Sequence, residues 1–394
     1  MPTDRADAAA AAVDADEVLA IAQALIRARS ENPGTTEDAA AEVVTGVLVA
    51  LGAAPETVRG EAGRPSVVAT IGRADGPTLA WNGHLDTVPA GTLDTWSVDP
   101  FAGEVVDGRL IGRGACDMKG PVAAALAGAA AVIHAGVELA GSLTFHLVAD
   151  EELAGTHGTQ VLRDRGLLTH DAAIVGEPSN LEVALAERGG AWVTATTFGA
   201  AAHGSQPHRG VNAITAMARF LLRLHEVVPE TVHPLCGRAT VNAALIEGGS
   251  APNMVPDRCV VEIDRRTIPG ETDPEKVLAP FLSLAEELRA DDPTFDIRTE
   301  IREWIMAAEA PADAAIASAI RTATAAETGA VPPDVGFTGI TDARFYLNDA
   351  AIPTVIFGPG DLSVAHTADE WIDVDEMVTG ARTYARIFAS FLGG

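Results

Sequence analysis

The stretch TLAWNGHLDTVP, residues 78–89, decides the fold class of this chain. Its first half is a run of apolar and β-prone residues that predicts a buried strand, and the run stops where His84 and Asp86 stand two positions apart. Runs of the same kind alternate with helical segments: strands at 66–72, 142–150 and 172–177, and helices at 121–136 and 159–166. This alternation predicts an α/β fold with a mostly parallel central sheet between helices.

The segments on either side of this core extend the pattern. Apolar residues recur at helical spacing over residues 18–26 and 43–51, so two helices are expected before the first strand. Toward the other end of the chain, a helix at 312–329 and a strand at 352–358 resume the alternation. Both ends of the sequence are therefore expected to belong to one large domain.

The middle of the chain follows a different pattern. Its elements come in the order strand, helix, strand, strand, helix, strand, at residues 192–199, 210–228, 239–249, 258–266, 273–291 and 295–302. The βαββαβ order is typical of a small ferredoxin-like α+β domain. We therefore expect residues 188–303 to form a domain inserted into a large domain of residues 1–187 and 304–394.

The composition limits the partners of the protein. Its 394 residues carry a formal net charge of −28, which repels phosphate backbones and anionic surfaces, so small molecules are expected rather than nucleic acid or membranes. Three cysteines, Cys116, Cys236 and Cys259, have no CxxC spacing and favour a reducing compartment, the cytoplasm. With no signal-peptide pattern and no apolar run of membrane-spanning length, we expect a soluble protein that is not exported.

Acidic and imidazole side chains gather where the predicted strands end. They are His84, Asp117, Glu151, Glu152, Glu177 and His366. Ligand sites of open α/β sheets form at the carboxyl ends of strands. Two imidazoles with several carboxylates are a ligand set for zinc or a similar divalent ion, and an extra carboxylate allows two ions to share a bridge. Each residue alone is more often structural, but the joint pattern predicts a metal site.

A series of motifs gives this pattern a family resemblance. They are GHLDTVP, GRGACDMKG, ADEELAGTHG, VGEPSN, HGSQPHRGVNAI, APNMVPD, DRRTIPGE, GITDARF and AHTADEWI, in chain order. From about residue 15 to the C-terminus the chain resembles the di-zinc metallopeptidase family. That family contains aminoacylase, acetylornithine deacetylase, succinyl-diaminopimelate desuccinylase and carboxypeptidase G, and the motifs occur in its order.

The resemblance implies two bound divalent ions, with Zn²⁺ expected and Co²⁺ or Mn²⁺ as alternatives. His84 and Glu177 would hold one ion, Glu152 and His366 would hold the other, and Asp117 would bridge them. In the family, the peptide bond after the bridging aspartate is cis. Asp117–Met118 is therefore expected to be a cis bond that does not involve proline.

Three more residues are expected to act in catalysis. The resemblance makes Glu151 the general base. Since a ligating histidine usually donates its other ring N–H to a carboxylate, Asp86 is expected to accept that bond from His84. His203 resembles the histidine that helps to form the oxyanion hole, which in dimeric members comes from the neighbouring subunit. The inserted domain is therefore expected to serve as a lid and dimerisation domain, and the protein to be a homodimer.

The resemblance also points to residues that contact the substrate. Asn253, Arg266 and Thr341 match positions that bind substrate in the family. An arginine suits a free carboxylate because its guanidinium donates two parallel hydrogen bonds. The family often has a small residue where this chain has Ile340, so the shape of the pocket, and with it the substrate, stays open.

These observations together predict a zinc-dependent hydrolase that acts on linear amide C–N bonds and cleaves an N-acyl amino acid. A dipeptidase or carboxypeptidase of the same family would share every metal residue, and sequence does not separate them. A nucleotide-binding oxidoreductase is disfavoured, because no GxGxxG follows the first strands. A catalytically silent metal-binding protein is disfavoured too, because it would not need Glu151.

Overall fold

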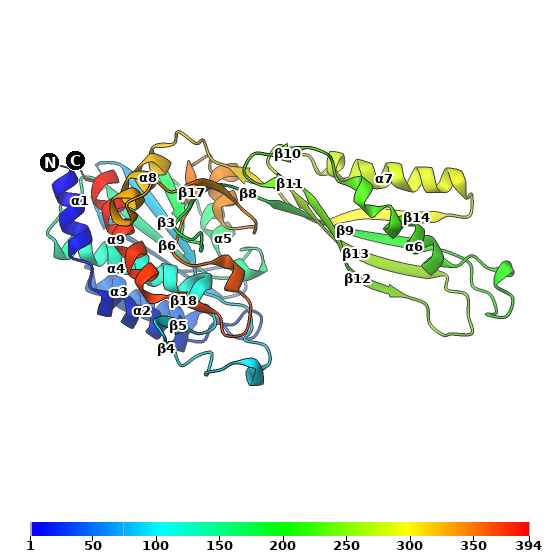
Figure 1. Cartoon of the computed structure of the whole chain (residues 1–394), viewed down its shortest axis with the longest axis horizontal. Helices are drawn as coiled ribbons and strands as arrows, with labels where there is room; N and C mark the ends of the chain where they lie inside the picture. Colours follow the sequence, from blue (N-terminus) through cyan, green and yellow to red (C-terminus); the bar gives the residue numbers. More distant parts are fainter. Residues whose placement is uncertain (1, 74, 394) are drawn as a thin grey trace. The chain divides into compact units, whose positions relative to one another are not determined.

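The computed structural model describes residues 2–73 and 75–393, and the chain divides into two compact units (Figure 1). The large unit comprises residues 1–185, 310–335 and 341–394, and the small unit comprises residues 186–309 and 336–340. The small unit thus takes in residues 186–187, 304–309 and 336–340, which we expected in the large domain. The reason is strand pairing: β14 (Asp296–Ile305) runs on past residue 303, and β15 (Ala308–Glu309) pairs with Ala186 and Glu187.

The large unit has a sheet with a parallel centre and antiparallel edges. Its strand order is β1 (Glu56–Arg59), β2 (Pro65–Gly72), β6 (Ser142–Val148), β3 (Thr78–His84), β7 (Ala172–Val175), β17 (Thr354–Ile356), β8 (Val183–Glu187) and β15, and β16 (Asp334–Phe337) also pairs with β8. Neighbours from β6 to β17 run parallel, whereas the pairs β1–β2, β2–β6 and β17–β8 are antiparallel. The expected α/β class with a mostly parallel central sheet is confirmed.

Helices of the large unit pack against one another beside this sheet (Figure 1). They are α1 (Pro2–Ala11), α2 (Ala15–Arg27), α3 (Asp38–Ala50), α4 (Gly120–His134), α5 (Thr159–Asp164), α8 (Ala315–Thr328) and α9 (Val374–Phe391). The sequence pattern did not assign α1, because an alanine-rich run has high helix propensity but no apolar stripe. The stretch Ala115–His134 is long and apolar enough to cross a membrane, but 94% of that window is buried, as befits a core helix.

A short three-stranded sheet completes the large unit. It has the order β18 (Trp371–Asp373), β5 (Arg109–Ile111) and β4 (Glu104–Val106), and both pairs are antiparallel. The pairing brings Trp371 opposite Ile111, so the segment before the last helix lies beside the segment that leads into α4.

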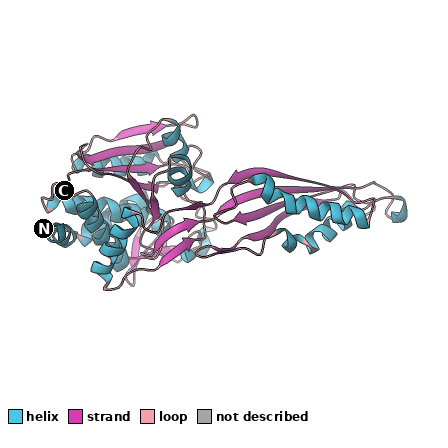
Figure 2. Ribbon diagram, turned by 90° about the horizontal axis from the view of Figure 1, so that it is seen from above, coloured by secondary structure: helices cyan, strands magenta, loops and turns pink. Residues whose placement is uncertain are grey.

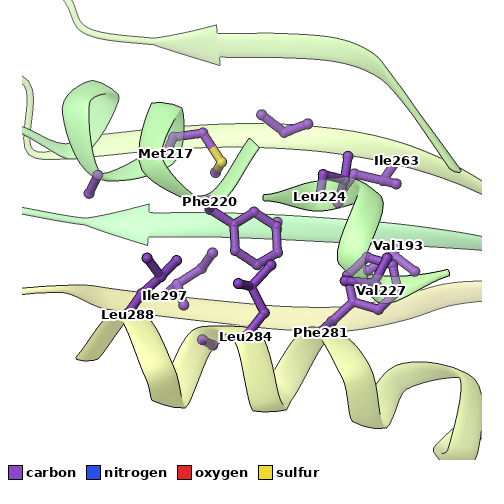
Figure 3. Close-up of a cluster of buried hydrophobic side chains, with 14 of the residues drawn as sticks. Val193, Met217, Phe220, Leu224, Val227, Ile263, Phe281, Leu284, Leu288 and Ile297 are labelled. Carbon is purple, nitrogen blue, oxygen red and sulfur yellow. The ribbon is translucent and has the colours of Figure 1, made fainter. Parts of the chain in front are cut away.

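The small unit has the ferredoxin-like topology. In chain order it contains β9 (Gly189–Phe198), α6 (Ala213–Leu222), β12 (Thr240–Gly248), β13 (Arg258–Thr267), α7 (Pro274–Asp291) and β14. The sheet order is β12-β13-β9-β14, with all pairs antiparallel. Both helices lie on one face of this sheet (Figure 2). They bury apolar side chains against it, among them Val193, Phe220, Ile263 and Phe281 (Figure 3).

One predicted helix is shorter than expected. The pattern at 210–228 predicts a single helix, but α6 ends at Leu222 and a 3₁₀ turn follows at Leu224–Val227. Arg223 has φ −106° and ψ 3°, and Val228 is extended. Because a residue before proline is pushed out of the helical region, Pro229 prevents the helix from continuing through Val228.

The small unit offers a matched test of its core on one helix. Phe220 is fully buried between the sheet and α7, whereas Leu222, two positions along, is 78% exposed. We expect Phe220→Ala to lower the free energy of unfolding by about 3–5 kcal/mol, since it leaves a cavity. Leu222→Ala should change it by no more than about 0.5 kcal/mol. Urea denaturation of both variants measures the difference, and equal losses would contradict the packing described here.

Candidate metal centre

The predicted metal residues follow the strands of the parallel centre. His84 is the last residue of β3, Glu152 lies in the 3₁₀ turn Glu151–Leu153 after β6, and Glu177 follows β7. Asp117 stands in the tight turn Ala115–Lys119 that leads into α4, and His366 follows β17. Since these strands are parallel neighbours, their carboxyl ends meet at one edge of the sheet of the large unit.

The side chain of Asp117 lies at the middle of this group. Its Oδ1 is 2.9 Å from Nε2 of His84, and its Oδ2 is 3.4 Å from Nε2 of His366. His84 Nε2 is also 3.9 Å from Glu177 Oε1, and His366 Nε2 is 3.1 Å from Glu152 Oε2. Each oxygen of one carboxylate therefore faces a different imidazole, and each imidazole has a further carboxylate beside it.

Burial makes this cluster electrostatically demanding. The side chains of His84, Asp117, Glu152 and Glu177 are all less than a tenth exposed, whereas His366 is about half exposed. Buried carboxylates of like sign are unfavourable unless cations or hydrogen-bond donors balance them. Imidazole nitrogens and carboxylate oxygens are also the donor atoms that divalent zinc prefers. The residues present therefore fit a centre for divalent cations.

The pKa shifts in the cluster favour positively charged imidazoles and a negatively charged Asp117. Hydrogen bonds to Asp117 and Glu152 raise the pKa of His366 to about 10. Burial acts to lower the pKa of His84, but the contacts with Asp117 and Glu177 outweigh it and raise that pKa well above its ordinary value. For Asp117, burial acts to raise the pKa, and the hydrogen bonds with His366 and His84 reverse this and lower it.

Glu151 belongs to the same cluster. One oxygen of its carboxylate lies within 4.8 Å of the ligand atoms of His84 and Glu177. Burial, followed by the charge of Glu177, raises the pKa of Glu151 well above its ordinary value. Its neighbour Glu152 differs in its contacts, because Glu152 touches His366 and accepts the N–H of Val88 at 3.1 Å. The two adjacent glutamates therefore face different parts of the site.

Asp86 has contacts that differ from the expected ones. The ring nitrogen Nδ1 of His84 lies 2.9 Å from the backbone oxygen of Asp86 and 3.6 Å from its carboxylate. The carboxylate instead accepts the backbone N–H groups of Glu151 at 3.2 Å and Glu152 at 3.3 Å. The expected contact is thus made by the main chain, which lies closer to the ring. The Asp86 carboxylate holds the turn that carries both glutamates.

Asn32 is a site residue that the sequence reasoning missed. It is buried, and its amide nitrogen donates to Asp86 Oδ2 at 3.0 Å and to Asp150 Oδ1 at 2.9 Å. A side-chain amide has two N–H donors on one nitrogen, so it can serve two carboxylates at once. Asn32 lies in SENPG, residues 30–34, between the two helices expected at 18–26 and 43–51, where no motif points to it.

Two peptide bonds near the site are cis. Asp117–Met118 is cis, as the resemblance implied, and Asn32–Pro33 is the other such bond among the described residues.

The remaining predicted residues belong to both units. In the small unit, His203 is exposed and forms an isolated antiparallel β-bridge with Met254. The ring nitrogen Nδ1 of His203 lies 2.8 Å from the hydroxyl of Ser205. Asn253 accepts the N–H of Gly204 at 2.7 Å, so it is next to that histidine in space. Arg266 is partly exposed and pairs with Asp264 at 2.9 Å. Thr341, in the large unit, is buried, and its hydroxyl accepts the N–H of Ala343.

A mostly parallel α/β sheet that gathers imidazoles around a shared carboxylate at its carboxyl edge is typical of proteins with a centre for divalent cations. The chain belongs to peptidase family M20/M25/M40, whose model matches residues 80–390. It is therefore a hydrolase that acts on amide bonds, and the family expected from the motifs is confirmed.

Individual relatives agree with this assignment. The chain is 33% identical to an acetylornithine deacetylase of Myxococcus xanthus over 325 residues, 80% of each protein. It is also 33% identical over 396 residues to a succinyl-diaminopimelate desuccinylase of Phenylobacterium zucineum, covering 97% of this chain and 99% of the relative. Its fold is similar to that of an M20 metallo-carboxypeptidase from Sulfolobus solfataricus, with a TM-score of 0.79, 17% identity, and coverage of 95% and 99%.

The contacts of Asn32 generate a prediction about stability. Asn32→Leu removes both N–H donors and leaves Asp86 and Asp150 each short of a hydrogen bond, so it should lower the free energy of unfolding by about 1–3 kcal/mol or more. Asn32→Asp has nearly the same shape but places a third carboxylate there, so it should cost at least as much. Urea denaturation at neutral pH tests both, and an unchanged midpoint for Asn32→Asp would contradict the bridging contact.

Proposed function

We propose that this protein hydrolyses the amide bond of an N-acyl amino acid, releasing a carboxylic acid and the free amino acid. The observation that carries the proposal is the position of Asp117, whose two carboxylate oxygens each face one imidazole. The names of the two relatives, an acetylornithine deacetylase and a succinyl-diaminopimelate desuccinylase, support this substrate class. The first name describes the removal of an acetyl group and the second the removal of a succinyl group.

The proposed ligand sets follow the contacts in the large unit. His84 and Glu177 would hold one divalent ion, His366 and Glu152 would hold a second, and Asp117 would bridge them. Zn²⁺ is the proposed ion, with Co²⁺ or Mn²⁺ as alternatives. When bound, such ions supply Lewis acidity that polarises a carbonyl group and lowers the pKa of a water molecule.

Glu151 is the proposed general base. It would take the proton of the attacking water and pass it to the leaving amine, as a carboxylate not used as a ligand can do. Burial raises its pKa, so its affinity for a proton exceeds that of an ordinary glutamate. Nearby cations favour the charged form of a carboxylate and would bring this pKa down again. The Asp86 carboxylate, which accepts the N–H of Glu151, would keep the base in place.

The small unit would supply the other contacts with substrate. His203 is proposed to help form the oxyanion hole, and Asn253 and Arg266, with Thr341 of the large unit, to bind the substrate. A homodimer is proposed as well, with His203 reaching the site of the other subunit. Supporting this, β12 pairs with β13 alone among the described strands, and its Leu245 and Ile246 are well exposed. Such an edge strand is a ready surface for another chain.

The proposed location is the cytoplasm. Cys116, Cys236 and Cys259 are all free and buried, which fits a reducing compartment.

The alternative function is a dipeptidase or carboxypeptidase of the same family. The likeness to the metallo-carboxypeptidase concerns the fold, and that activity would use the same metal residues. The two functions differ on the acyl side of the scissile bond, which carries a free α-amino group in a dipeptide and none in an N-acetyl or N-succinyl amino acid. A panel of N-acetyl and N-succinyl amino acids and dipeptides separates them, assayed with protein stripped of metal and reloaded with Zn²⁺, Co²⁺ or Mn²⁺. Cleavage of dipeptides alone would contradict the acyl-amino-acid proposal.

Adjacent glutamates generate a prediction that separates base from ligand. Glu151→Gln should keep both ions but lower kcat by about 10²- to 10⁴-fold, because only the proton acceptor is lost. Glu152→Gln should weaken the binding of one ion, because a neutral amide is a poorer ligand than a carboxylate. Elemental analysis after dialysis gives the ions per chain. Equal metal loss in both variants would contradict the assignment.

Arg266 generates a prediction about the substrate. If it binds the free carboxylate, Arg266→Ala should lower kcat/KM for an N-acyl amino acid at least about tenfold, yet barely change it for the matching amide that lacks the carboxylate. Arg266→Lys should rescue only in part, because an ammonium group cannot make the paired contact. The other interpretation is the ion pair with Asp264, worth at most about 1 kcal/mol. In that case both substrates should lose activity equally.

A further inference from the structure

A buried ion pair lies in the large unit, and neither of its members belongs to the proposed ligand set. Arg113 Nη1 donates to Glu370 Oε2 at 2.5 Å, and the side chains are 3% and 0% exposed. Arg113 follows β5 and Glu370 precedes β18, strands that pair with each other. The backbone repeats the link, since Gly112 N–H donates to the carbonyl oxygen of Glu370 at 2.9 Å.

The second oxygen of Glu370 leads directly to the site. Oε1 accepts the backbone N–H of Cys116 at 3.0 Å and that of Asp117 at 3.1 Å. One carboxylate thus receives a guanidinium on one oxygen and two consecutive amides on the other. Those amides belong to the tight turn that presents Asp117, so the position of Glu370 bears on where the Asp117 carboxylate points.

Glu370 is also close in sequence to the second imidazole. His366 stands four positions before it, and the segment between them is attached elsewhere by Asp369, which accepts the N–H and the hydroxyl of Ser97 at 2.7 and 3.0 Å. The segment 366–370 therefore holds His366 at one end and the backbone of Asp117 at the other. The contacts of Glu370 therefore help to set the distance between His366 and Asp117.

Stability alone gives little reason for such a pair. A fully buried ion pair costs so much desolvation that an apolar replacement of similar volume is often neutral or stabilising. A charged acceptor for two amides, by contrast, fixes a backbone segment with short, directional bonds. The pair lies between the backbone of Asp117 and the segment that carries His366, and this position favours a positioning role.

We propose that Glu370, oriented by Arg113, is a positioning residue that fixes the Asp117 carboxylate against His366. The inference rests on the proposed bridging role of Asp117. Partners of metal ligands of this kind usually change metal affinity or activity about 10- to 100-fold when they are replaced. Glu370 would act on the backbone of Asp117 and not on the Asp117 side chain.

The test compares Glu370→Gln with a matched control. Glu327 forms a mostly buried ion pair with Arg386 between α8 and α9, with side chains 12% and 15% exposed, and takes no part in the site. Glu370→Gln and Glu327→Gln each replace by an amide one carboxylate of an ion pair, fully buried at Glu370 and mostly buried at Glu327. Both proteins and the wild type are stripped of metal, titrated with CoCl₂, and followed by visible absorption, ions per chain, Tm, kcat and KM.

The expected result is a difference in metal chemistry at similar stability. Glu370→Gln should weaken binding of at least one Co²⁺ ion about 10- to 100-fold, change the visible spectrum, and lower kcat more than it changes KM. Glu327→Gln should lower Tm but keep the wild-type spectrum and affinities. Arg113→Lys retains a cation beside Glu370 and should fall between Glu370→Gln and the wild type.

Other results would overturn the inference. If Glu370→Gln keeps the wild-type spectrum, affinities and kcat while Tm falls as in Glu327→Gln, the pair is only structural. If Glu370→Gln does not fold, Arg113→Lys decides: an altered spectrum supports the positioning role, and an unaltered one contradicts it. A wild-type chain that binds fewer than two Co²⁺ ions would instead contradict the proposed function, and with it the basis of this inference.

Discussion

The large unit depends on the balance of charge among buried carboxylates at the edge of its parallel sheet. Glu177, Glu152 and Asp117 lie where little water reaches them, so imidazoles, backbone amides or cations must balance them. Two sets of residues surround the carboxylates. Imidazoles of His84 and His366 face Asp117, and around them Asp86 and Asn32 bind the turns that present the acidic groups. Contacts with charged groups thus fix the conformation of the polar loops, and the sheet brings these loops to one edge.

Motif and periodicity predicted the parts of this arrangement that are local in sequence. The strand before His84 and the turn after β6 both show in short windows of sequence, because apolar runs and the polar residues that end them are neighbours in the chain. The ferredoxin-like order of the small unit could be predicted for the same reason. The long helix predicted at 210–228 was wrong at its end: Pro229 accounts for the extended Val228, but the change to a 3₁₀ turn after Leu222 has no signal in the apolar pattern.

Contacts between distant segments were not predicted. Arg113 and Glu370 are 257 positions apart, and Asn32 reaches Asp150 across 118. No periodicity links such residues, and each one alone resembles an ordinary loop residue. The same is true of the strands: β1, β8, β15 and β16 were not predicted, and the pattern does not give the order of the strands that were. What was missed is the set of polar contacts that joins one loop to another.

The position of β17 between β7 and β8 has a consequence for how the protein is made. This strand pairs with β7 on one side and β8 on the other, yet a ribosome synthesises it after the whole of the small unit. A growing chain therefore displays β7 and β8 with their shared neighbour still to come, and such unpaired strand edges attract other chains. The last residue of β17, Ile356, and His366 then follow in one short stretch of chain. Translation of roughly nine tenths of the sequence thus precedes the moment at which the centre can first assemble.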